Sequence, residues 1–299
     1  MLNVYEQVDR NKTRSTLIVL LFAVFITAAV YFIGRGLGYG PGFIGIALIV
    51  SGISSFAGYW YSDRIILTIS KARPASKKQD SLFYSVVENI SLGAGIPMPK
   101  LYIIDDSAPN AFATGRDIDH AVVCATNGLL QKLNRTELEG VIAHEISHIK
   151  NYDMRLMSVV TVLVGMVILL SDWALRSSFR RSSNNREGGQ VGSILVVVGV
   201  VVALLSPLFA KMIQLALSRR RELLADAGSV LITRQPAGLI SALKKLSTDK
   251  EPLEVANKAT AHLFIVNPFS QAGNKRNFSS LFNTHPSVEE RIKNLEAME

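Results

Sequence analysis

Four long apolar runs constrain this chain more than any other feature of its sequence. Each run approaches the roughly 20 residues that an α-helix needs to cross a lipid bilayer. Hydrophobic residues make up 48% of the 299 residues, and polar or charged stretches separate the runs. This clustering predicts several membrane spans and a water-facing part. The runs cover residues 17–33, 43–61, 156–173 and 192–210.

The first two runs predict a hairpin of two spans. The charged segment before the first run raises the alternative of a signal peptide. However, this run is longer than the usual apolar region of a signal peptide, and a glycine-rich stretch follows it in place of a cleavage site with small residues. Aromatic residues lie near the ends of both runs, where their rings suit the membrane interface.

Positive charge is concentrated beside the apolar runs. The net charge is +8, and many lysines and arginines flank the runs. This placement predicts contact with a lipid bilayer and no nucleic acid as a partner. The loop of the first hairpin holds only Arg35, so the positive-inside rule predicts a multi-pass protein of the cell membrane whose soluble parts face the cytoplasm. The arginine-rich linker 174–191 conflicts with this orientation, because it would lie outside.

The polar stretches have the pattern of a small α+β domain. Apolar spacing predicts a helix over 81–92, and short strands are expected within 100–105, 110–115 and 120–126. A further helix is expected over 134–151, because Asn134 and Glu137 have the spacing of a capping box. Cys124 is the single cysteine and is expected in the core, which excludes both a disulfide and a cysteine-rich zinc site.

The central motif is His144-Glu145-Ile146-Ser147-His148. On a helix, positions i and i+4 share a face, so both imidazoles can bind one metal ion. Glu145 then lies where a carboxylate can take a proton from a water that attacks a peptide bond. The alternative is a pair of ordinary surface histidines, which the apolar positions of the same helix disfavour.

A catalytic zinc needs a third protein ligand. The metzincin pattern would require glycine at position 151 and histidine at 154, but the sequence has Asn151 and Met154. A glutamate on a second helix is the other common solution, and Glu222 fits it. Asp226 lies one turn later, where it can hydrogen-bond a ligand imidazole. The competing interpretation is a solvated charged face beside three arginines.

The order of the segments supports this pairing. The first ligand helix leads directly into the third apolar run, and the Glu222 segment follows the fourth. If these two spans pack together, both ligand segments emerge at one face of the membrane. The residues just before His144 are too polar for the bilayer core, which argues against an intramembrane site.

Four motifs together resemble the HtpX-type membrane metalloproteases, which are relatives of the CAAX prenyl proteases. The motifs are PNAFATG, HEISHIKNYD, RELLADAGS and THPSVEERI, in that order. The resemblance implies a zinc endopeptidase of the cell membrane with one Zn²⁺ per subunit. It implies membrane proteins or unfolded polypeptides as substrates, in a role in quality control. The implied ligands are His144, His148 and Glu222, with Glu145 as the base and Asp226 beside a ligand.

The resemblance also gives two other segments a role. Asn110, Ala111 and Phe112 would form an edge strand to which an extended substrate adds by backbone hydrogen bonds; without the resemblance they are an ordinary strand. His285 would donate to the developing oxyanion, with Arg291 supporting the site. The alternative for His285 is a surface residue that caps a helix.

The expected fold is a mainly α membrane protein. Four transmembrane helices carry a cytoplasmic α+β zinc protease domain of the gluzincin type with a small sheet. Two other functions stay open: a non-catalytic membrane adaptor with a vestigial metal site, and a prenyl-protein protease. The parts are the first hairpin (1–62), the first catalytic part (63–155), the second pair of spans (156–210) and the second catalytic part (211–299).

Overall fold

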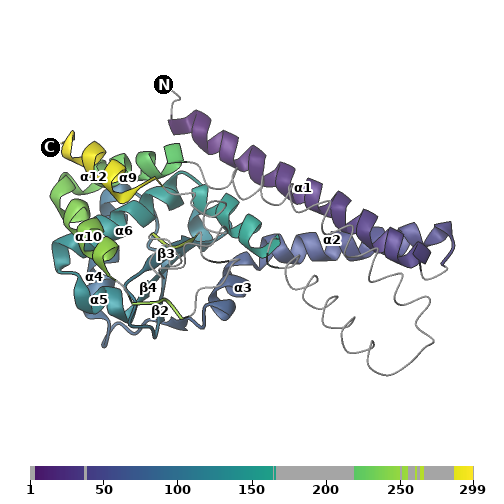
Figure 1. The fold of residues 1–299 in the computed structure, drawn as a ribbon, viewed down its shortest axis with the longest axis horizontal. Helices are drawn as coiled ribbons and strands as arrows, with labels where there is room; N and C mark the ends of the chain where they lie inside the picture. Colours follow the sequence, from purple (N-terminus) through teal and green to yellow (C-terminus); the bar gives the residue numbers. More distant parts are fainter. Residues whose placement is uncertain are drawn as a thin grey trace.

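A helical hairpin projects from a mostly helical body that contains one small sheet (Figure 1). The structure is a computed structural model. It describes residues 4–36, 39–163, 165, 219–249, 251–254, 260, 263–265 and 286–298.

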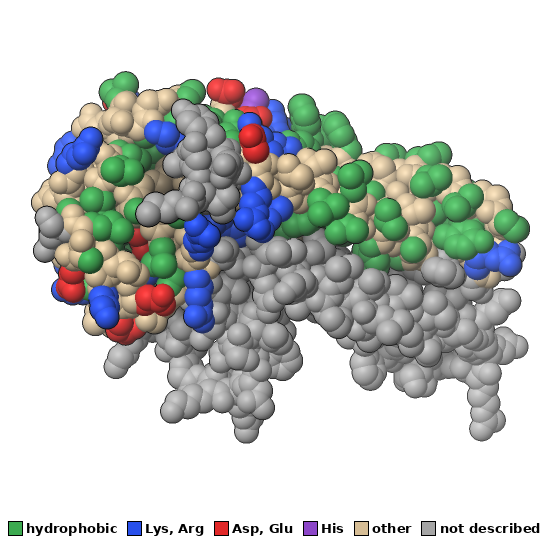
Figure 2. Space-filling model, turned by 90° about the horizontal axis from the view of Figure 1, so that it is seen from above, with side chains coloured by type: hydrophobic (Ala, Val, Ile, Leu, Met, Phe, Trp, Pro, Cys, Tyr) green, Lys and Arg blue, Asp and Glu red, His purple; other side chains and the backbone are tan. Residues whose placement is uncertain are grey.

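The hairpin consists of α1 (Val4–Gly36) and α2 (Ile44–Trp60), joined through a short 3₁₀ turn at Pro41–Phe43. The two helices lie side by side, and the Thr27 hydroxyl lies 2.7 Å from that of Ser51 across their contact (Figure 1). Apolar side chains cover much of the outer surface of the hairpin (Figure 2). In the described part of the chain, two helical stretches are long and apolar enough to cross a membrane, Val8–Tyr31 and Pro41–Trp60.

The predicted third and fourth spans fall mostly outside the described residues. The first half of the third run, 156–163, is helical and buried against the body and α1. Its side chains therefore pack against protein in this structure. Residues 192–210 of the fourth run lie outside the described part.

The sheet has the strand order β1-β2-β4-β3. β2 (Lys100–Ile104) and β4 (Val122–Thr126) are parallel, whereas β1 (Arg73–Pro74) and β3 (Ala111–Thr114) pair antiparallel to their neighbours. The sheet is therefore mixed, and β3 forms one edge. The three strands predicted from the sequence are confirmed, and the two-residue β1 was not foreseen.

Alternating side chains of the sheet pack into two separate hydrophobic clusters, as strand geometry requires. On one face, Ala113 and Val123 pack with α4 (Ser81–Ala94) and α6 (Arg135–Lys150). On the other face, Phe112 and Cys124 pack with the buried residues of α1 and with 156–163. The sheet thus lies between the helices of the body and the base of the hairpin.

α6 is the central helix of the body. It begins at Asn134 with the predicted capping box, in which the Asn134 and Glu137 side chains each accept from the other residue's backbone N–H. It packs against α9 (Arg219–Thr233) and α10 (Pro236–Thr248), and α12 (Val288–Glu296) covers α9 and α10. The described residues also include two short α-helices, α3 (Ser62–Ile69) and α5 (Asn127–Lys132), and a 3₁₀ helix at Ile118–His120.

Candidate metal centre

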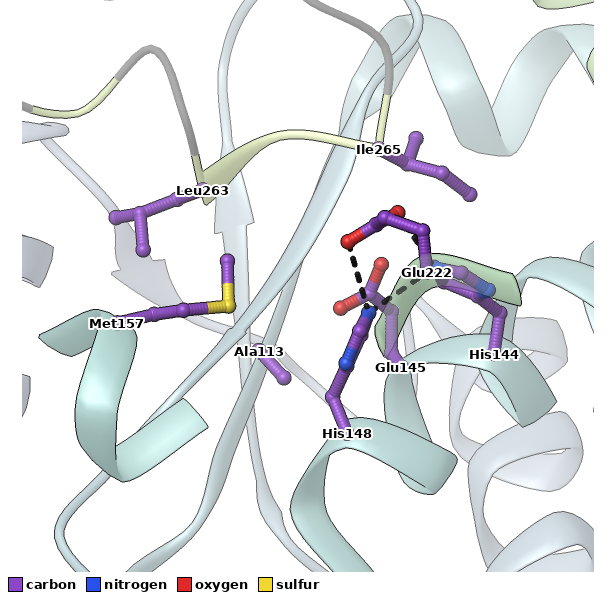
Figure 3. Close-up of a pocket in the computed structure, with 8 residues that line it drawn as sticks. All are labelled: Ala113, His144, Glu145, His148, Met157, Glu222, Leu263 and Ile265. Atoms are coloured by element: carbon purple, nitrogen blue, oxygen red, sulfur yellow. Dashed lines mark hydrogen bonds and ion pairs between the residues drawn. The ribbon is translucent and has the colours of Figure 1, made fainter. Parts of the chain in front are cut away.

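Two helices bring three potential metal ligands together inside the body. His144 and His148 lie on one face of α6, and Glu222 lies in the first turn of α9. The two imidazole Nε2 atoms are 3.2 Å apart, and the Glu222 carboxylate oxygens lie 3.7 Å from His144 Nε2 and 3.6 Å from His148 Nε2. Figure 3 shows these groups converging on one point.

This donor set fits a tetrahedral metal ion. Zinc binds histidine nitrogen and carboxylate oxygen at about 2.0–2.2 Å, so two ligands of one tetrahedral ion are about 3.4 Å apart. The observed separations of 3.2 to 3.7 Å agree with that value. In the described part of the chain, His144, His148 and Glu222 form the one group of acidic, histidine or cysteine side chains that could hold an ion.

A buried carboxylate contacts the Nδ1 atom of each imidazole and orients the ring. His144 Nδ1 lies 2.9 Å from Asp226 Oδ1, and His148 Nδ1 lies 3.2 Å from Asp153 Oδ2. Both carboxylates therefore accept the Nδ1 proton, which leaves the two Nε2 atoms to face each other and Glu222. Asp226 was anticipated from its helical spacing to Glu222. The role of Asp153 was missed, although it follows His148 in the quoted motif.

Arg291 holds Asp226 in place. Its Nη2 lies 2.6 Å from Asp226 Oδ1 and its Nε lies 2.9 Å from Oδ2, so the pair is bidentate. Burial would raise the pKa of Asp226, but the Arg291 charge and the hydrogen bond from His144 lower that pKa to about 2. Asp226 is thus an anion at neutral pH. Arg291 was predicted to support the site, and in the structure it contacts the site through Asp226.

The pKa of His148 is also shifted by a buried, charged neighbour, Asp153. Burial would lower the pKa of this imidazole, but the hydrogen bond to Asp153 and the nearby carboxylate of Glu222 raise it to about 9. In the metal-free protein His148 therefore carries a proton at neutral pH, which a metal must displace.

Glu145 lies beside the side chains of the three potential ligands and is not one of them (Figure 3). It is 3% exposed, and burial raises the pKa of its carboxyl group against the opposing effect of the two histidines. The backbone N–H of Ala113 on β3 donates to this carboxylate. Glu145 and the three donor residues line one small pocket, and Met157, Leu263 and Ile265 add apolar side chains to its wall.

The predicted substrate strand lies next to this pocket. Ala111 belongs to β3 and its carbonyl accepts a hydrogen bond from Ile265 N–H at 3.1 Å. Phe112 points to the opposite face of the sheet, where its ring meets that of Phe264 edge-on at 5.3 Å. Asn110 is buried just before the strand. The outer edge of β3 thus runs from Ala111 toward Glu145, and its pairing with a substrate stays a prediction.

His285 lies outside the described residues, so its predicted contact with an oxyanion stays a prediction. The described C-terminal segment begins at Pro286 and continues into α12, which carries Arg291.

The chain is similar in sequence to known proteases. The model of a family described as "Peptidase family M48" matches residues 77–299. A "Protease HtpX homolog" of Dictyoglomus turgidum is 43% identical over 294 residues, which cover 98% of this chain and 94% of that protein. The protein of the same description from Tropheryma whipplei is 44% identical and is matched over 98% of both chains.

The fold is also similar to a solved structure. The crystal structure of S. mikatae Ste24p matches with a TM-score of 0.50 and 21% sequence identity, over 98% of this chain and 67% of that one. At this identity the likeness concerns the fold alone.

Proposed function

Because the chain belongs to peptidase family M48 and is a membrane metalloprotease, we propose that His144, His148 and Glu222 bind one catalytic Zn²⁺ and that Glu145 is the general base. The observation that carries this proposal is the spacing of the donor atoms, 3.2 to 3.7 Å, with a second carboxylate, that of Glu145, beside them. Two imidazoles and one carboxylate suit zinc better than calcium or magnesium, which prefer all-oxygen sites.

The proposed reaction is hydrolysis of a peptide bond. The metal, when bound, supplies Lewis-acid activation of the carbonyl group and of water. Glu145 takes the proton from the attacking water and delivers it to the leaving amine nitrogen. The raised pKa of Glu145 suits the first transfer, because a carboxylate with a higher pKa is a stronger base. His285 is proposed to donate to the oxyanion that develops on the substrate.

The proposed substrates are unfolded polypeptides and damaged membrane proteins. An extended chain is proposed to lie along β3, at the edge formed by Asn110, Ala111 and Phe112, because β3 is an edge strand and its Ala113 lines the pocket at the site. The apolar residues Met157, Leu263 and Ile265 beside the site support contact with hydrophobic side chains, which such substrates expose. Quality control of membrane proteins is the role that these properties favour.

We further propose four spans with the metal centre at the cytoplasmic rim of the cell membrane. Both ends of the apolar hairpin lie at the body and its loop lies far from it, which supports one membrane face for the whole body (Figure 1). Basic side chains at the body end of the hairpin include Lys12, Arg14 and Arg64, whereas the loop side has Arg35. The positive-inside rule then favours the cytoplasm for the body.

Metal-dependent cleavage tests the proposal. The whole chain is purified in detergent, stripped of metal, and supplied with zinc, magnesium or calcium before incubation with casein and with an unfolded membrane protein. Cleavage that returns with zinc alone among these three ions is the expected result. Zinc binding without any cleavage would favour a non-catalytic adaptor. Cleavage confined to prenylated peptides would favour a prenyl-protein protease.

A further inference from the structure

The turn after α6 brings Asp153 back toward the metal site. Tyr152 has a φ of 59°, in the left-handed region that a residue with a side chain seldom adopts. This conformation ends α6 and starts the helical segment from 153. As a result the Asp153 carboxylate, which is fully buried, reaches His148 Nδ1 at 3.2 Å. The orientation of this imidazole therefore depends on a strained turn.

Asn11 of the first membrane helix holds this turn. Its side-chain amide nitrogen donates to Asp153 Oδ1 at 2.7 Å and to the backbone carbonyl of Asn151 at 2.9 Å. Asn11 is 2% exposed, so both hydrogen bonds are shielded from water. The next residue, Lys12, places its Nζ 4.4 Å from the centre of the Tyr152 ring. Two consecutive residues of α1 thus contact all three residues of the turn.

The same asparagine contacts the helix of the third ligand. Arg221 precedes Glu222 in α9, and its Nη1 lies 3.4 Å from Asn11 Oδ1. The Nε of Arg221 lies 3.6 Å from Asp153 Oδ1, so these three side chains form one buried cluster. Asn11 therefore lies where the two ligand-bearing elements meet, although it is far from both in sequence.

We propose that Asn11 is a positioning residue of the metal centre, and that α1 is part of that centre as well as a membrane anchor. Asn11 fixes one oxygen of Asp153 and leaves the other oxygen for His148. The proposal rests on the proposed metal site. Removal of a group that hydrogen-bonds a ligand histidine commonly weakens metal binding about 10–100-fold. Because Asn11 acts through Asp153, we expect an effect near the lower end of that range.

Three variants test the proposal in the whole chain. Asn11→Ala removes the amide. Asn11→Asp keeps the size of the side chain but removes both N–H donors. Thr13→Ala is the matched control, because the exposed Thr13 hydroxyl donates to the Asp9 carbonyl within α1. Zinc affinity is measured by competition with a chelator, and the visible absorption spectrum is recorded for protein saturated with cobalt.

We expect Asn11→Ala and Asn11→Asp to bind zinc about tenfold more weakly than Thr13→Ala and to shift the cobalt spectrum, which reports ligand geometry. If Asn11→Ala does not fold, the result for Asn11→Asp tests the proposal. A role of Asn11 in packing alone would leave the cobalt spectrum of Asn11→Asp unchanged. Zinc affinity within twofold of the control and an unchanged spectrum would overturn the proposal. A wild-type chain that binds no zinc would instead overturn the proposed metal site and this inference with it.

Discussion

Arg291 and Asp226 form a bidentate ion pair in which both side chains are almost completely buried, with Nη2–Oδ1 and Nε–Oδ2 distances of 2.6 and 2.9 Å. Removal of the guanidinium in Arg291→Met leaves a buried carboxylate without its charge partner. We expect the free energy of unfolding of the metal-free protein to fall by about 3–5 kcal/mol. Chemical denaturation measures this change.

A double variant provides the control for this prediction. Arg291→Met combined with Asp226→Asn removes both charges, and the Asn side chain can still accept from His144. We expect the double variant to be more stable than Arg291→Met alone, because no uncompensated charge stays buried. A double variant that is as unstable as the two single effects added together would contradict the coupling of the two residues.

Asp226 also makes the protein sensitive to acid. Its folded-state pKa of about 2 lies below the value of 3.8 for an unperturbed aspartate. A carboxyl group whose pKa is lowered by folding stabilises the protein above the unfolded pKa, and this contribution disappears as the pH falls through the folded pKa. We expect metal-free wild type to lose about 2 kcal/mol of stability between roughly pH 5 and pH 2 from this group. In the same measurements, the free energy of unfolding of Asp226→Asn should change less with pH.

Local patterns in the sequence predict the elements that carry the site. The capping box predicts where α6 begins, and helical spacing places His144 and His148 on one face. Glu222 follows from the chemistry of a third ligand, because the sequence lacks the metzincin histidine. Short apolar runs with turns between them predict β2, β3 and β4. The helix and strand predictions work because each depends on residues close together in the chain, whereas Glu222 was inferred from the number of ligands that a catalytic zinc requires.

Contacts between distant segments could not be predicted in the same way. Asp153 lies near His148 in sequence, but its role depends on the left-handed turn at Tyr152. Asn11 meets this turn across 142 positions of sequence, and no local pattern marks it. The bidentate contact of Arg291 with Asp226 requires the packing of α12 on α9, which only the tertiary fold provides.

Close packing of α6 and α9 sets the distance between the histidines and Glu222. A Cβ atom added at Gly228 would lie 2.5 Å from the Ser147 hydroxyl oxygen and 3.0 Å from the Ser147 Cβ. Gly228→Ala should therefore push the helices apart, destabilise the protein by about 1–3 kcal/mol and weaken zinc binding. Thermal unfolding and chelator competition measure the two effects.

Two further substitutions separate this clash from a general effect of alanine. Gly93→Ala is the control, since a Cβ there meets only Ile232 at an ordinary 3.7 Å. It should leave zinc affinity unchanged. Adding Ser147→Ala to Gly228→Ala removes the closer of the two clashes and should restore part of the lost affinity. No restoration would argue against the clash as the cause.

Zinc binding should release a proton from His148. The pKa of this imidazole is raised to about 9 in the metal-free protein, so the ring is protonated at pH 7, whereas a metal ligand must be neutral. Calorimetry in buffers with different ionisation enthalpies counts the released protons. We expect about one proton from this ring at pH 7 and a declining number as the pH rises past 9. Zinc binding without proton release at pH 7 would contradict the assignment.

The central claim is that Glu145 performs proton transfer at a metal centre that it does not itself hold. Glu145→Gln and the control Glu139→Gln, which alters a carboxylate paired with Arg135 near the start of the same helix, are assayed for zinc content and casein cleavage in the same preparations. We predict that both variants retain one zinc per chain, and that Glu145→Gln alone loses cleavage by about 10²–10⁴-fold. Glu145→Gln protein that holds zinc and still cleaves at the wild-type rate would contradict the account.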